Sequence, residues 1–136
     1  MSSIKGKDNE FFYKELSHEV IGACFAVHSQ LGCGLPEHCY NKALMVEFKR
    51  REIFCTYQEQ FDVHYCGAYV GHFVTDLVVD SKIILELKAV EGITPGHQPE
   101  FITYLTISGL RVGYVVNFGV RSLQFKRLVR TFQPSL

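Results

Sequence analysis

The stretch FVTDLVVDSKIILELKA, residues 73–89, decides the fold because it contains two apolar runs joined by a short polar turn. Two runs of β-branched and aliphatic residues flank the polar residues 80–82, a pattern that is typical of a β-hairpin. Charged side chains interrupt these apolar strands at Asp76, Glu86 and Lys88. Burying a charge without a partner is costly. The three side chains therefore need a common environment that compensates them.

The length of the hairpin loop determines whether these charges meet. With a three-residue loop, residues 80–82, Asp76 lies directly opposite Glu86 on one face of the sheet, and alternation places Lys88 on the same face. A two-residue loop would turn Asp76 to the other face. We predict the three-residue loop, because two carboxylates and an ammonium group at one place make chemical sense as a divalent-cation site. A few oxygen ligands with room for water and phosphate suit Mg²⁺.

Two motifs resemble those of a known family. The order of Asp76 and the ELK triplet at residues 86–88 resembles the D…(D/E)-x-K core of the PD-(D/E)XK nuclease superfamily. The heptapeptide GLPEHCY, residues 34–40, resembles the name-giving pattern of the GxxExxY protein family, a small branch of that superfamily. Further matching flanks are VHSQLG at 27–32, ELKA at 86–89, GLRVG at 109–113 and NF at 117–118. The resemblance covers about residues 16–130.

The resemblance implies an activity and a set of site residues. It implies an α/β fold with a restriction-endonuclease-like αβββαβ core, in which helices flank a mixed central sheet. The activity would be Mg²⁺-dependent hydrolysis of phosphodiester bonds in DNA or RNA, with Mn²⁺ as an alternative ion. Asp76, Glu86 and the backbone carbonyl of Leu87 would hold the metal, and Lys88 would orient water or stabilise developing charge. Glu37 is an additional candidate ligand, although a carboxylate in the first turn of a helix is also favourable by itself.

Accessory positions show both agreement with the family pattern and departures from it. Glu100 stands four residues before Tyr104, where the family usually has Gln, and Ala26 stands where the family generally has an acidic residue. Glu100, Tyr104 and His28 are therefore candidate accessory residues. The alternative for His28, a partly buried hydrogen-bonded side chain, is the more common role of such a residue.

Composition restricts the partners. The chain has 136 residues, 47% of them hydrophobic, and its 14 basic residues balance 14 acidic ones. We expect a disordered lead-in over residues 1–9 and one globular domain over residues 10–136. Since proteins that bind phosphates are usually basic overall, any nucleic-acid contact must be a local patch. The basic residues near the C-terminus are candidates, although basic residues on a terminal strand more often only keep an edge strand soluble: Arg111, Arg121, Lys126, Arg127 and Arg130.

Cysteine usage and hydropathy restrict the compartment. The five cysteines are odd in number and show no zinc-site spacing, which favours reduced structural thiols and a cytoplasmic location. No run of 18 apolar residues is present, and residues 1–9 lack a signal-peptide core. We therefore expect neither secretion nor a membrane span.

Periodicity predicts the order of the elements. Apolar spacing predicts helices over about residues 10–30, 36–51 and 98–108. Alternation predicts an antiparallel meander over residues 56–65, 69–79 and 82–88, followed by strands at 111–117 and 123–129. The helix between the third and fourth strands is long enough to serve as the crossover of a parallel pair.

Two classes of function remain open. The first is a metal-dependent nuclease, favoured by intact Asp76, Glu86, Lys88 and Glu37. The second is a catalytically inactive nuclease-fold module for nucleic-acid or protein binding, favoured by zero net charge and by Glu100. A different phosphoesterase use of the same metal site is a third possibility. The small size of the chain suggests a homodimer, since a larger surface would help to hold a substrate.

Overall fold

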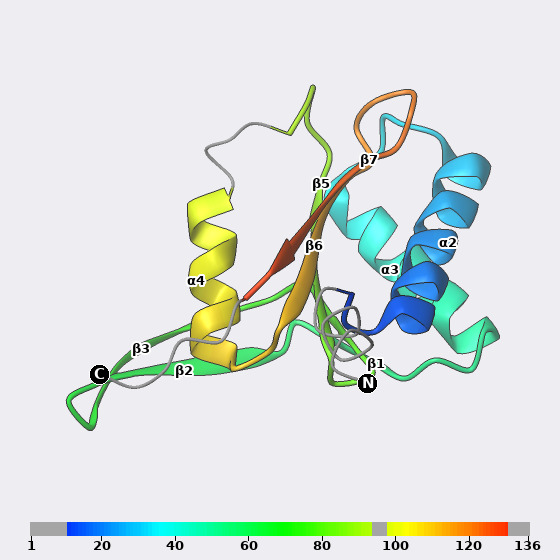
Figure 1. Cartoon of the computed structure of the whole chain (residues 1–136). Coiled ribbons are helices and arrows are strands. Elements are labelled where there is room, and N and C mark those ends of the chain that lie inside the picture. Colours follow the sequence, from blue (N-terminus) through cyan, green and yellow to red (C-terminus); the bar gives the residue numbers. More distant parts are fainter. Residues whose placement is uncertain (1–10, 94–97, 131–136) are drawn as a thin grey trace.

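A mixed β-sheet with helices on both faces forms the body of the molecule. The computed structural model describes residues 11–93 and 98–130, so the predicted lead-in at residues 1–9 lies outside the described residues. Two helices, α2 and α3, cover one face of the sheet and a third helix, α4, lies on the other face (Figure 1). This arrangement confirms the predicted α/β class with a restriction-endonuclease-like core.

The main sheet contains one parallel pair of strands and is otherwise antiparallel. The elements are α2 (Lys14–Leu31), α3 (Glu37–Arg50), β1 (Cys55–Tyr57), β2 (Gln60–Tyr65), β3 (Ala68–Val74), β4 (Leu77–Val79), β5 (Ile83–Lys88), α4 (Gln98–Ser108), β6 (Val112–Asn117) and β7 (Gln124–Val129). The main sheet has the order β1-β4-β5-β6-β7, in which only β5 and β6 are parallel. Helix α4 is the crossover that connects them, as the sequence predicts.

Helices α2 and α3 begin and end close to the predicted residues. Gly32 ends α2 with a positive φ of 72°, which glycine adopts readily, and its N–H donates to the carbonyl of His28. Pro36 precedes the first residue of α3 with φ −65°, a value that proline adopts without strain. Among the residues that the structure describes, no helix is both long and apolar enough to cross a membrane.

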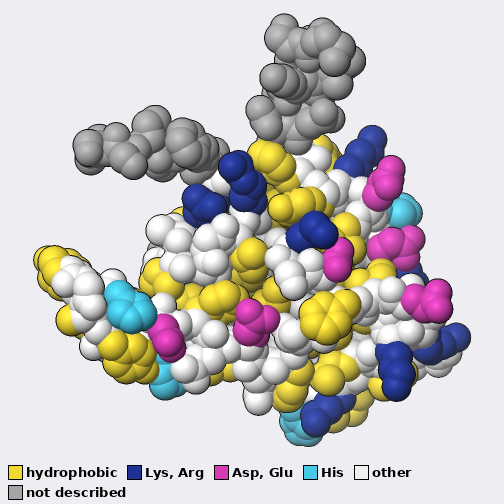
Figure 2. Space-filling model, turned by 90° about the horizontal axis from the view of Figure 1, so that it is seen from below, with side chains coloured by type: hydrophobic (Ala, Val, Ile, Leu, Met, Phe, Trp, Pro, Cys, Tyr) yellow, Lys and Arg dark blue, Asp and Glu magenta, His cyan; other side chains and the backbone are white. Residues whose placement is uncertain are grey.

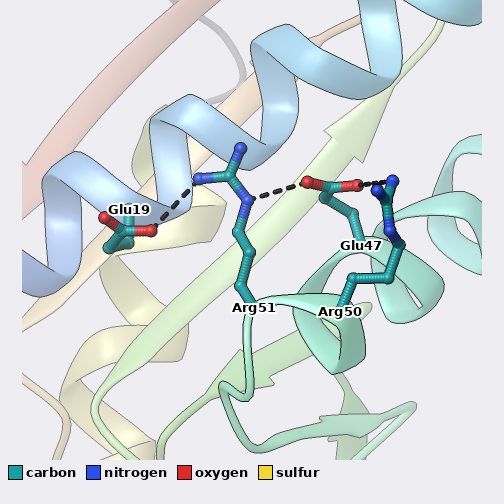
Figure 3. A network of polar contacts seen from close by, with 4 residues as sticks. All are labelled: Glu19, Glu47, Arg50 and Arg51. Atoms are coloured by element: carbon teal, nitrogen blue, oxygen red, sulfur yellow. Dashed lines mark hydrogen bonds and ion pairs between the residues drawn. The ribbon is translucent and has the colours of Figure 1, made fainter.

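An arginine ties the two helices together on their outer side. Arg51 donates from Nη1 to Glu19 of α2 at 3.1 Å and from Nε to Glu47 of α3 at 2.8 Å (Figure 3). Arg50 also contacts Glu47, but its side chain is 75% exposed. The hydrogen bond from Arg51 is the main cause that lowers the pKa of Glu47. Arg51 therefore links α2 to the end of α3.

Alternation along the strands divides the core into two apolar clusters. Ile83, Leu85 and Leu87 of β5 pack with α2 and α3, whereas Ile84 packs with Phe101 and Leu105 of α4. The approach of α4 is close at Gly113, where an added Cβ would lie 2.3 Å from the ring of Phe101. The five cysteines are all free, and burial raises the pKa of Cys24 to about 12, as expected of a structural thiol.

The predicted meander is wrong in one respect, because its long strands are broken. The segments predicted at residues 56–65 and 69–79 divide into a β1/β4 pair in the main sheet and a separate β2/β3 ribbon. At the break, Gln58 has a positive φ of 55°, and its N–H donates to the carbonyl of Asp76 at 2.9 Å. The N–H of Thr75 donates to the carbonyl of Glu59 at 3.0 Å. Backbone pairing therefore continues across the break while the strand direction changes.

The β2/β3 ribbon projects from the body beneath α4 (Figure 1). Three stacked rings attach its base to that helix: Phe61 stacks on Phe73, and Phe73 stacks on Tyr104 with 4.3 Å between ring centroids. Figure 2 shows the ribbon as an arm with hydrophobic and histidine side chains on its surface. Because the ribbon begins directly after the break, its attachment to α4 also determines where Asp76 lies.

Candidate active site

The hairpin between β4 and β5 has the predicted three-residue loop. Asp80 and Ser81 are left-handed, with φ 51° and 55°, and the N–H of Lys82 donates to the carbonyl of Val79. Val79 pairs with Ile83 and Leu77 pairs with Leu85. The same register, extended by one residue, places Asp76 opposite Glu86.

The side chains of Asp76 and Glu86 each accept a hydrogen bond from the opposite backbone segment, just before β4 begins. The N–H of Leu87 donates to Oδ2 of Asp76 at 2.7 Å, and the N–H of Asp76 donates to Oε1 of Glu86 at 3.3 Å. Alternation from Val78 and Ile84, which pack with α4, places both carboxylates on the α4 face. The Asp76 carboxylate thus occupies the edge of β5 that the short strand β4 leaves uncovered.

The carbonyl of Leu87 points to the same edge. The carbonyl of Lys88 accepts a hydrogen bond from the N–H of Phe118, on the β6 side of β5. Since the N–H and C=O groups of successive strand residues alternate between the two neighbouring strands, both groups of Leu87 face the β4 side. The three oxygen donors predicted for a metal, from Asp76, Glu86 and Leu87, therefore lie around one short stretch of backbone.

Burial and the charge of a neighbouring carboxylate raise the pKa values of both carboxyl groups. Burial is the main cause for Asp76, opposed by the hydrogen bond from Leu87 and reinforced by the nearby carboxylate of Glu37. Burial, followed by the charge of Asp76, raises the pKa of Glu86 to about 8, and Lys88 acts in the opposite direction on both groups. Two neighbouring carboxyl groups that resist simultaneous ionisation favour a bound cation.

Glu37 reaches this site from the other layer of the molecule. It is the first residue of α3, it is exposed, and its Oε2 accepts a hydrogen bond from the N–H of Ala89 at 3.3 Å. Its charge also contributes to the raised pKa of Asp76. The structure therefore brings Glu37 to the end of β5 while it remains in a helical first turn, where a carboxylate is favourable.

Helix α4 contributes a hydroxyl and a fourth carboxylate. Tyr104 donates from its hydroxyl to Glu100 at 2.5 Å, and Glu100 helps to raise the pKa of Glu86. Burial and then Glu100 raise the pKa of Tyr104 itself. A cavity of about 20 Å³, the size of one water molecule, lies among Glu86, Lys88, Glu100, Phe101, Tyr104 and Val115. The two accessory candidates on α4 therefore lie beside the carboxylate pair.

Other candidates take part in internal contacts. His28 shares a hydrogen bond from Nε2 with the carbonyl of Val120 at 2.8 Å and packs on Phe118, which agrees with a partly buried hydrogen-bonded role. Arg127 donates to Tyr114, to Ser17 and to the carbonyl of Phe12, and Arg130 donates to the carbonyls of Gly109 and Leu110. These two arginines connect β7 to the body of the protein.

The donor set fits a magnesium ion that is held by few protein ligands. In the described part of the chain, no three His, Cys, Asp or Glu side chains are grouped so that they could hold a metal ion. Mg²⁺ commonly binds through only one or two carboxylates and keeps several waters or substrate oxygens. Asp76 and Glu86, with the carbonyl of Leu87, match that requirement in number and in donor type.

One residue of this region was noted in the sequence only as part of the NF flank, with no role at the site. Asn117 ends the apolar strand VGYVVN, is fully buried and pairs with Lys88 in the parallel ladder. Its side chain hydrogen-bonds to the backbone of Val90. A polar amide at the end of a run that is otherwise buried is the signal that could have identified it.

Comparison with known proteins identifies the family of the chain. A family model described as the PD-(D/E)XK nuclease superfamily matches residues 14–128. No curated protein and no solved structure matches the chain. The matched region contains Glu37, Asp76, Glu86 and Lys88, and it spans most of the sequence. The chain therefore belongs to the PD-(D/E)XK nuclease superfamily.

Proposed function

We propose that this protein is a Mg²⁺-dependent nuclease of the GxxExxY branch that hydrolyses phosphodiester bonds in DNA or RNA. The observation that supports this proposal is the meeting of Asp76 and Glu86 at the uncovered edge of β5, where burial and repulsion raise both pKa values. Membership of the superfamily supports a nuclease-like activity. Mn²⁺ is the alternative ion.

The first group of residues would hold the metal. Asp76, Glu86 and the carbonyl of Leu87 supply the oxygen donors, and Glu37 adds a carboxylate close to Asp76. When bound, the metal supplies a Lewis acid that polarises a phosphoryl oxygen and acidifies a bound water. The hydrogen bond from Leu87 to Asp76 keeps one of these carboxylates oriented before any ligand arrives.

The second group would act on the water and on the phosphate. Lys88 lies on the same face as the carboxylate pair, where its ammonium group can orient the attacking water or stabilise negative charge that develops on the phosphate. Tyr104 holds Glu100 by a hydrogen bond beside Glu86 and Lys88. We assign Glu100 and Tyr104 an accessory role in orienting water, with Glu100 in the place of the Gln that the resembled family usually has.

The alternative of a non-catalytic binding module has less support, because Asp76, Glu86, Lys88 and Glu37 are all present. The charges of Glu37 and Lys88 shift the pKa of Asp76, and those of Asp76 and Lys88 shift the pKa of Glu86. The homodimer and the cytoplasmic location remain predictions that rest on the sequence alone.

Cleavage assays with one matched control test the proposal. Wild type, Glu86→Ala and Asp80→Asn are incubated with single- and double-stranded DNA and RNA in Mg²⁺, in Mn²⁺ or in EDTA, and metal binding is measured by calorimetry. Asp80 is the control because it is an acid of the same hairpin at the opposite end from the site. We expect Glu86→Ala to be about 10³-fold slower than wild type, whereas Asp80→Asn retains activity.

Two results would count against the proposal. Cleavage that survives unchanged in Glu86→Ala would indicate a contaminating nuclease. Metal binding by the wild type without cleavage of any of the four substrates would favour the non-catalytic module.

A further inference from the structure

The side-chain amide of Asn117 replaces backbone pairing just beyond the end of β5. Asn117 is fully buried, and its Oδ1 accepts hydrogen bonds from the N–H groups of Val90 and Gly119, both at 3.0 Å. Its Nδ2 donates to the carbonyl of Val90 and to Oε1 of Gln124, both at 3.1 Å. An amide has two donors and two acceptor lone pairs, so all four are used.

Residues 118 and 119 hold the same segment by close backbone approach. The N–H of Phe118 donates to the carbonyl of Lys88 at 2.8 Å. A Cβ added at Gly119 would lie 2.5 Å from the backbone N and O of Val90 and 2.6 Å from the carbonyl carbon of Ala89. Only glycine permits this approach. The backbone over residues 88–90 is therefore held by three consecutive residues, 117–119, which we call the brace.

The brace also reaches the turn that precedes Glu37. Phe118 stacks on Tyr40 of α3, with ring centroids 4.6 Å apart and planes 17° apart. The hydroxyl of Tyr40 donates to the carbonyl of Gly32 at 2.7 Å and accepts from the N–H of Leu35 at 3.2 Å. Glu37 in turn accepts from the N–H of Ala89. The brace thus contacts the backbone at the end of β5, which carries Lys88, and the side chain of Tyr40 in α3, the helix that begins at Glu37.

We propose that Asn117 is a positioning residue, whose amide fixes the backbone of Val90 and thereby holds Lys88 and the N–H of Ala89 in place beside Glu37 and the carboxylate pair. A buried amide is costly unless it is fully hydrogen-bonded, and a fully satisfied one makes the local structure rigid. The consequence for catalysis rests on the proposed function, whereas the consequence for the backbone does not.

Amide exchange tests the backbone claim without any need for catalysis. Hydrogen exchange is followed by NMR on ¹⁵N-labelled, metal-free wild type, Asn117→Ala, Gln124→Ala and Ser17→Ala. Ser17 is the matched control, since it is also buried and polar but hydrogen-bonds to Arg127 on β7. In Asn117→Ala we expect the amides of Val90 and Gly119 to exchange at least about fivefold faster. Gln124→Ala should show a smaller change in the same direction, and Ser17→Ala none at these amides.

Kinetics test the catalytic claim on the same variants. Loss of positioning lowers kcat by about tenfold or more while KM stays within about threefold, because ground-state binding does not depend on the brace. Gln124 is exposed, so Gln124→Ala keeps the test available if Asn117→Ala does not fold. Ser17→Ala should retain the wild-type kcat.

Separate results decide the two claims. Unchanged exchange at Val90 in the folded variants would overturn the backbone claim. Faster exchange with a kcat equal to that of Ser17→Ala would overturn the catalytic claim. If the wild type cleaves no substrate, the proposed function fails, and faster exchange at Val90 still supports the brace as a positioning device for residues 88–90.

Discussion

The two faces of strand β5 are built differently. On the face covered by α2 and α3, Ile83, Leu85 and Leu87 are at most 1% exposed and contact only the apolar core. On the α4 face, Ile84 is equally buried, but Glu86 and Lys88 follow it and are only partly buried. The same six-residue strand thus carries apolar core on one side and charge on the other.

This difference indicates that one face of β5 contributes to stability and the other face to the chemistry of the site. The charged side chains lie just beyond the start of β4, and all three are partly buried, whereas the apolar residues of β5 are fully buried. The opposite face is closed by two helices that are joined to each other. Substitutions on the two faces should therefore separate loss of activity from loss of stability.

The largest expected effect is on activity, from a change on the charged face. Asp76→Asn keeps an oxygen that can accept from the N–H of Leu87 but removes the negative charge, so kcat should fall about 10³-fold. The melting temperature should stay level or rise, because a buried repulsion is relieved. Steady-state cleavage and thermal unfolding measure the two effects. Asp62→Asn, on the projecting ribbon, is the control, and an equal loss of kcat there would contradict the assignment.

The next effect is on stability, from a change on the apolar face. Leu85→Ala leaves a cavity between β5 and the two helices, and we expect it to cost about 3 kcal/mol of unfolding free energy. Urea denaturation measures this cost. Activity per folded molecule should stay close to that of wild type. A large fall in kcat with unchanged stability would contradict the claim that the apolar face determines stability and the charged face determines activity.

The charged face should also make the metal-free protein sensitive to pH. The folded-state pKa of Glu86, about 8, is above its ordinary value of 4.5. The folded state therefore keeps its proton while the unfolded state loses it, so stability falls as pH rises from 4.5 to 8 and levels off above that.

Glu86→Gln isolates this effect, because the amide does not titrate. In EDTA, the variant should become more stable than wild type by on the order of 2 kcal/mol between pH 4.5 and 8, allowing for the partial exposure of Glu86. Denaturation at several pH values measures the difference between the two proteins. A difference that does not change with pH would show that Glu86 is ionised in the folded state throughout this range.

The smallest effect concerns the link between the helices of the apolar face. Arg51→Met removes the hydrogen bonds to Glu19 and Glu47 and should cost about 1 kcal/mol. Arg50→Met, at a neighbouring residue whose side chain is 75% exposed, should cost close to nothing. Equal costs in urea denaturation would mean that Arg51 does not join α2 to α3.

Local sequence patterns were sufficient for the elements that follow from residue type alone. The polar residues 80–82 predicted a hairpin turn. The expectation of a shared cation site then favoured the three-residue loop, which places Asp76 opposite Glu86 and which the register confirms. The third predicted helix, residues 98–108, agrees with α4. In each case the residues that predict the element belong to the element itself or lie within a few residues of it.

Features that depend on distant contacts were not predictable in this way. Three polar residues in a row, 58–60, interrupt the alternation, but Gln58 has a left-handed backbone although it is neither Gly nor Asn, so no turn residue marked the break between β1 and β2. The partner of Asn117 is Val90, 27 residues away. The change of strand direction and the brace become visible only when the chain is folded.

Diffraction from crystals soaked in Mn²⁺ tests the central claim most directly, because anomalous scattering locates the ion without reference to activity. The account predicts one strong peak between the carboxylates of Asp76 and Glu86, within bonding distance of the carbonyl of Leu87. A peak elsewhere, or no peak with both carboxylates ordered, would contradict it.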